Sequence, residues 1–217
     1  MSAPRGLAGA AALGAALCVL GAAPAAQAQR LWDGDILVVQ PEVGLSMANV
    51  YAFSNNNLIP GLTESRVSGP RFGGTVGVRL GPVMIGAHGD LSRFKPYDVG
   101  TLGARVEVRL AVIGIQPFVR AGLGYAWLGD INPSSPLWTC GPTAGASAQC
   151  PDIRGWHATA GGGIDYAVMR HFTIGAALDL SVLNLTRSAS PTMVNLQQEG
   201  DSVGVQATLS VHAALRL

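Results

Sequence analysis

Charge is scarce in this sequence, and what charge there is balances. Only 12% of the 217 residues are charged, and 14 Lys and Arg stand against 13 Asp and Glu, a formal net charge of +1. Such a chain has no bulk field that would draw it to nucleic acid or to acidic substrates, so we expect no nucleic-acid partner. The 48% of hydrophobic residues also excludes a disordered polymer. The composition predicts one domain, or at most two small ones, with a large apolar surface to bury.

Long hydrophobic runs are missing after residue 29, which excludes a membrane-spanning helix there. Before that point, Arg5 precedes an apolar run over residues 7–23 and an A-x-A cleavage site at 26–28. This order is typical of a secretory signal peptide. An N-terminal membrane anchor is the alternative, but the run consists mostly of Ala and Gly. We therefore predict a signal peptide over residues 1–28 and a mature domain over residues 29–217.

Cysteine is also scarce. Of the three in the chain, Cys18 lies in the predicted signal peptide, which leaves Cys140 and Cys150. An even number in an exported protein predicts a disulfide between them, and closing that loop is worth roughly 3 kcal/mol. A metal site is the alternative, but no His flanks the pair at ligand spacing. We expect neither a metal nor a cofactor.

The mature chain is rich in alternation with a period of two. Apolar residues alternate with polar residues or glycine in eight segments, over residues 39–47, 71–80, 83–92, 102–110, 115–127, 157–168, 172–182 and 203–217. Strict alternation predicts β-strands with one apolar and one polar face. Segments of about ten residues also match the length of a tilted transmembrane strand.

The polar face carries arginine and carboxylates but almost no lysine; Lys95 is the only lysine in the chain. Strands that face solvent normally use Lys freely, so this face is expected to line a filled polar lumen while the Val, Leu, Ile and Ala face meets lipid. We predict lumen ion pairs, with Glu107 paired to several arginines, among Glu42, Arg79, Asp90, Arg105, Glu107, Arg109, Arg120, Asp165 and Asp179. A narrow path for solutes or ions is the alternative, and these pairs would have to open to form it.

The connections between the predicted strands differ in length in a regular order. Three are short, at 81–82, 111–114 and 169–171, and these alternate with four long ones, at 48–70, 93–101, 128–155 and 184–202. Outer-membrane barrels have short periplasmic turns and long extracellular loops. The long connections are therefore expected outside the cell, with the predicted disulfide in the third.

Two strings carry a family likeness. Residues 116–125 (QPFVRAGLGY) and 161–166 (GGGIDY) resemble the small bacterial outer-membrane β-barrel superfamily of OmpA-type and OmpX-type proteins, and the likeness covers the mature chain. It implies an all-β fold, an eight-stranded antiparallel up-and-down transmembrane β-barrel in the cell outer membrane of a Gram-negative bacterium. It also implies insertion by the outer-membrane assembly machinery. We expect a monomer that contacts outer-membrane lipid. The final strand ends at Leu217, where the family usually has Phe.

Catalytic patterns are weak. His88 and Asp90 share one strand face and could form half of a catalytic pair or a metal site. Lipid hydrolases of the barrel family use a His together with a Ser. The nearest pairs in this sequence are His157 with Thr159 and His212 with Ser210. None of them forms a motif, so no enzyme activity is expected. The sequence favours a structural or surface-interaction role, with loops that bind an extracellular ligand. A small-solute pore, a lipid-modifying enzyme and a soluble ligand-binding barrel are the alternatives.

Overall fold

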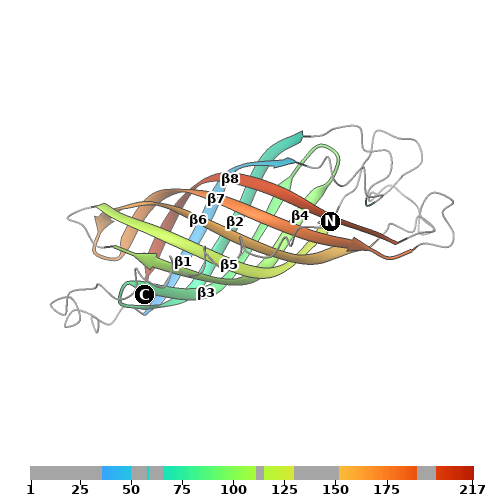
Figure 1. Ribbon diagram of the computed structural model, residues 1–217. Helices are drawn as coiled ribbons and strands as arrows, with labels where there is room; N and C mark the ends of the chain where they lie inside the picture. The colour runs from blue at the N-terminus through green and yellow to red at the C-terminus, as the bar shows by residue number, and fades with distance from the viewer. Residues whose placement is uncertain (1–35, 50–57, 59–65, 111–114, 130–151, 190–198) are drawn as a thin grey trace, which may run out of the picture. The chain divides into compact units, whose positions relative to one another are not determined.

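The computed structural model describes residues 36–49, 58, 66–110, 115–129, 152–189 and 199–217, and these fold into eight β-strands (Figure 1). The strands are β1 (Leu37–Asn49), β2 (Arg66–Leu80), β3 (Val83–Arg93), β4 (Asp98–Arg109), β5 (Ile115–Gly129), β6 (Ile153–Met169), β7 (Phe172–Arg187) and β8 (Gly200–Arg216). Each strand pairs antiparallel with the next, and β8 pairs with β1. This closed order confirms the predicted eight-stranded antiparallel barrel. No helix in the described ranges is long and apolar enough to cross a membrane.

Closure of the barrel depends on the contact between its first and last strands. In that pair Val39 lies opposite Leu215, and Leu37 and Leu217 exchange two backbone hydrogen bonds of 3.1 and 2.9 Å. The contact pairs the two edge strands along most of their length, with a gap at Gln40 and Pro41. Full closure is what a sheet needs in lipid, because no water is there to satisfy an open edge.

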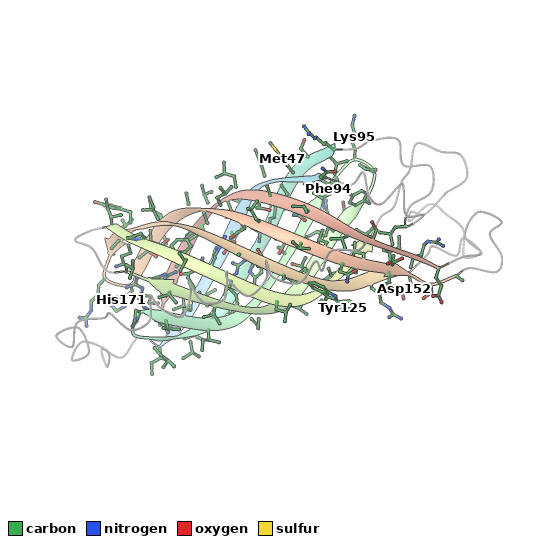
Figure 2. All side chains as sticks on the ribbon, in the orientation of Figure 1. Met47, Phe94, Lys95, Tyr125, Asp152 and His171 are labelled. Atoms are coloured by element: carbon green, nitrogen blue, oxygen red, sulfur yellow. The ribbon has the colours of Figure 1, made fainter. Side chains whose placement is uncertain are left out.

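The two faces of the strands have opposite environments. Outward side chains are large and apolar, and Leu45, Val119 and Leu123 are each about 60% exposed. Inward side chains are polar and closed off, with Glu107 at 0% and Arg105 at 1% exposed. Figure 2 shows side chains projecting from both sides of the barrel wall. The barrel is therefore inside-out relative to a soluble one, as predicted.

The exposed apolar side chains on the outside of the barrel form a belt, which we call the apolar band. Aromatic side chains lie near both of its edges. Tyr125, Trp127 and Trp156 are outward and 37–47% exposed near the ends of their strands, and the rings of Tyr125 and Trp127 stack at 6.0 Å. Trp127 lies on Gly100 of β4, where a Cβ atom would come within 2.3 Å of the indole ring. Tyr166, 57% exposed, lies near the opposite edge. Such aromatic rings favour the membrane–water interface.

One predicted connection is wrong. Residues 93–101 were expected to form a long loop, but β3 continues to Arg93 and β4 begins at Asp98. Here the Phe94 N–H donates to the Tyr97 carbonyl at 3.0 Å, and the two rings meet edge to face at 5.5 Å. Both side chains are buried, so the turn closes on its own apolar contact. The other three long connections contain fewer residues than predicted, because the strands that they join extend further at this end of the barrel.

That end of the barrel, which we call the outer end, reverses the pattern of the rest. Outward residues there are polar and exposed, such as Ser68, Arg154, Thr186 and Asp201. Inward residues there are apolar and buried, and with Leu58 they form one cluster, the outer core: Ala48, Leu58, Val67, Phe94, Tyr97, Val99, Ala126, Leu128, Ile153, Leu183 and Leu185. Apolar inside and polar outside is the arrangement of a β-barrel in water. The outer end therefore extends beyond the apolar band.

The reversal predicts a depth-dependent cost for charge on the outside of the barrel. Val106→Arg places a cation near the middle of the apolar band and is expected to lower the free energy of unfolding by about 2 to 4 kcal/mol. Ser68→Arg places the same side chain outward beyond the band and is expected to cost about 0 to 1 kcal/mol. Denaturant titration of the protein folded in lipid vesicles measures both. Equal costs at the two positions would contradict the boundary drawn here.

Candidate functional site

The centre of the lumen is organised by one carboxylate, Glu42 of β1. Its side chain is fully buried, and arginines from three other strands reach it: Arg71 Nη1 at 3.3 Å, Arg105 Nη1 at 2.7 Å and Arg120 Nη1 at 2.8 Å. Alternation places all four residues on the inward face of their strands. Two carboxylate oxygens offer about four acceptor positions, so a single Glu can serve all three donors.

Two further carboxylates complete this central cluster. Asp179 of β7 binds Arg120 in a bidentate pair, with Nε–Oδ1 at 2.7 Å and Nη2–Oδ2 at 2.5 Å. Asp90 of β3 lies 3.1 Å from Arg71 Nε and accepts a 2.5 Å hydrogen bond from Thr101. Three arginines thus face three acids. Neutral balance of this kind is what burial demands, because an unpaired charge in the lumen would be very costly.

His88 belongs to the same cluster. Its Nε2 lies 2.8 Å from Arg105 Nη2, and because a guanidinium only donates, Nε2 accepts this bond. The same Nε2 lies 3.1 Å from Asp90 Oδ2, and Nδ1 lies 3.0 Å from Thr75 Oγ1. Both ring nitrogens are therefore engaged in the wall of the lumen. The described residues also contain no group of three His, Cys, Asp or Glu that could hold a metal ion.

A second cluster lies nearer the short turns. Arg109 forms ion pairs with Glu107 and, at 3.2 Å, with Asp165, and its Nη2 donates to Gln40 at 3.0 Å. Asp165 also binds His212 Nε2 at 2.6 Å. A Cβ atom on Gly175 would lie 2.2 Å from Asp165 Oδ1 and 2.6 Å from His212 Nε2, so only glycine leaves room for this pair. Here the glycine gives clearance within the lumen.

The arrangement of the pairs differs from the predicted one. Eight of the nine predicted lumen residues take part in ion pairs, but within the described ranges Glu107 forms an ion pair with Arg109 alone, and Glu42 takes the central place expected for Glu107. Arg71, which was not among the nine, also binds Glu42. Arg79 makes no ion pair with the acids of the described residues; its Nε donates to the Gly81 carbonyl at 2.9 Å in the β2–β3 turn. Gly81 has φ of 64°, a conformation that glycine favours.

Little space remains between these side chains. A void of about 10 Å³ lies among Arg71, His88, Arg105, His157 and Asp179, which is room for about one water molecule. Toward the outer end, Ser46, Ser92, Gln206 and Thr208 join in a layer of hydrogen bonds, and the outer core follows. Ion pairs, a hydroxyl and amide layer, and an apolar cluster therefore fill the lumen in succession.

Of the weak catalytic candidates in the described residues, His88 and Asp90 do meet, with Nε2 3.1 Å from Oδ2, but arginines of the central cluster hold both side chains. The other two pairs do not assemble. His212 binds Asp165, while Ser210 lies 3.4 Å from Arg120 Nη2. His157 is buried, and the Thr159 hydroxyl donates to the Leu180 carbonyl at 3.3 Å. Among the described residues, neither pair has the hydrogen bond between nucleophile and base that acyl transfer needs. The predicted signal peptide and the predicted disulfide between Cys140 and Cys150 lie outside the described residues.

An apolar outer face, a filled polar lumen and eight antiparallel strands in a closed ring together define a small transmembrane barrel. No family model and no curated protein matches this sequence. Neisserial surface protein A is similar in structure, with a TM-score of 0.56 and 12% identity over 83% of this chain and 97% of its own. The N-terminal β-barrel domain of Pseudomonas aeruginosa OprF has a TM-score of 0.50 and 14% identity over 85% of this chain and all of its own.

At these identities the likeness concerns the fold. The fold is that of a small eight-stranded transmembrane β-barrel. The exposed apolar side chains on the outside of the barrel need lipid around them, as in a transmembrane barrel.

The central cluster predicts that Glu42 matters more to stability than any surface carboxylate. Glu42→Gln leaves three buried arginines without their shared anion and is expected to cost about 3 to 5 kcal/mol in unfolding free energy. The control is Asp152→Asn, which removes an exposed pair with Arg154 and should cost about 0 to 1 kcal/mol. Urea titration in vesicles compares the two. Similar costs for both variants would be incompatible with Glu42 as the centre of the lumen.

Proposed function

We propose that the protein is a structural or surface-interaction component of the outer membrane, and neither a pore nor an enzyme. The observation that carries this proposal is the filled lumen. A conducting path would have to separate Glu42 from three arginines and also pass the outer core. Parting a buried ion pair costs several kcal/mol, so spontaneous opening is rare.

The outer end supports a role at the cell surface. It carries exposed charged side chains of both signs on an apolar, packed core, including Arg66, Arg93, Lys95, Arg154 and Asp201. A rigid base of this kind suits the presentation of loops to an extracellular ligand, since binding residues are often held on loops above a rigid scaffold. The proposal includes a monomer that contacts outer-membrane lipid and reaches the membrane through the assembly machinery.

The lumen is tested by electrical recording. Purified protein reconstituted in planar bilayers is expected to give no steps of conductance above the lipid baseline. Steady single-channel openings in the natural protein would reject the closed lumen and favour a small-solute pore. The same preparation reports folding, because a folded barrel migrates faster on a gel before boiling than after it.

The role is tested in cells that lack the gene. If the role is structural, the deletion strain becomes more sensitive to detergent, and a variant with residues 130–151 replaced by a short glycine linker restores resistance as well as the full chain does. If the role is surface interaction, that variant fails where the full chain succeeds. A changed lipid composition in the deletion strain, reversed by the full chain, would point instead to a lipid-modifying enzyme.

A further inference from the structure

The outward face of the barrel has a hollow near the short-turn end. It lies across four adjacent strands, β6, β7, β8 and β1, and measures about 590 Å³. Val43, Val211, Ile164 and Tyr166 form its walls and are each 50–58% exposed. Ala213 lies between them in the same rows of the sheet, next to Ile174. Because Ala213 has a single methyl group among larger side chains, the surface sinks there.

The lining of the hollow is almost entirely apolar, and it opens within the lipid-facing band. The side chain of His212 below it is fully buried and bound to Asp165, so it presents no polar group to the hollow. A hydrocarbon chain therefore fits this surface, whereas a polar solute would lose its hydration there. The hydroxyl group of Tyr166 can lie at the membrane interface, as tyrosines commonly do.

An exposed cation lies in the short turn that follows β6, beyond the hollow. Arg170 and His171 form the exposed turn between β6 and β7, and Figure 2 places His171 at one end of the barrel, with Lys95 and Asp152 toward the other. Arg170 follows Tyr166 by four positions, about 10 Å along the axis for a tilted strand. Within the described part of the chain, Arg170 has no acidic partner within 4 Å. Its guanidinium is free to bind a phosphate, in the bidentate geometry that arginine favours.

We propose that the hollow and Arg170 together bind one phospholipid of the periplasmic leaflet. One acyl chain lies in the hollow over Ala213, and the lipid phosphate contacts Arg170. Charge complementarity argues for lipid over a second copy of this chain as the occupant. Two parallel copies packed through this face would bring their Arg170 side chains together at the same depth, and like charges repel.

The test is native mass spectrometry of the membrane-extracted protein in detergent, titrated with palmitoyl-oleoyl phosphatidylglycerol. We expect one lipid to be retained by the natural chain. Ala213→Phe, which fills the hollow with a side chain that lipid tolerates, is expected to weaken retention about fivefold, equivalent to ~1 kcal/mol. Arg170→Gln should weaken it to a similar degree by removing the phosphate contact.

Two matched variants serve as controls. Ala104→Phe makes the same change on β4, an outward position of the apolar band away from the hollow, and Arg66→Gln removes an exposed arginine at the outer end. Both are expected to retain lipid like the natural chain, and the gel shift on boiling verifies that all four variants fold.

Three results would overturn the proposal. Unchanged retention in Ala213→Phe would exclude the hollow as the site, and equal losses in Ala213→Phe and Ala104→Phe would mean that lipid coats the barrel without a preferred position. A dimer that Ala213→Phe dissociates would identify a second copy of the chain as the occupant.

Discussion

Burial of charge in the lumen is the constraint on which the rest of this barrel depends. Eight strands enclose a space that side chains must fill, and the alternating pattern turns polar side chains into it. Glu42 meets that constraint by binding Arg71, Arg105 and Arg120 at once, which ties β1 to β2, β4 and β5 across the interior. The preference for arginine over lysine follows, because a planar group with five donors can bind two acids in a fixed geometry.

The alternation of apolar and polar residues places the apolar face outward in one part of the barrel and inward in another. Within the apolar band, the outward face is apolar because lipid surrounds it, and the inward face is ionic. At the outer end the inward face is apolar and the outward face is polar. Val67, Val99 and Leu183 point inward there, while Ser68 and Asp201 point to water. A strand keeps its period of two throughout; only the surroundings change. The depth at which the outward face changes from apolar to polar marks the edge of the membrane more directly than the loop lengths do.

The number of strands, their order and the direction of each face could be predicted from the sequence, because alternation is a local property. The identity of the ion pairs could not, because partners are set by the stagger between strands that are distant in sequence. Glu107 lies two positions from Arg105 and from Arg109, so the sequence favoured it as the centre of the lumen ion pairs. The stagger between strands instead brings Arg105 to Glu42. The short turn at residues 94–97 escaped prediction for a related reason. Its Lys95 and Pro96 are typical of a loop, and its closing contact joins Phe94 to Tyr97 only after folding.

Because of the outer core, sequence changes in the connections are expected to affect stability less than sequence changes in the strands. Because the strand ends at that side are held by their own packed apolar cluster, the segments that connect them can vary in length and composition while the membrane-spanning part keeps its fold. Sequence changes in the connections are therefore expected to carry little penalty in the stability of the barrel. Leu58 is the exception, since it lies in the first connection and is wholly buried in the cluster. That position should stay apolar while its neighbours in the sequence diversify.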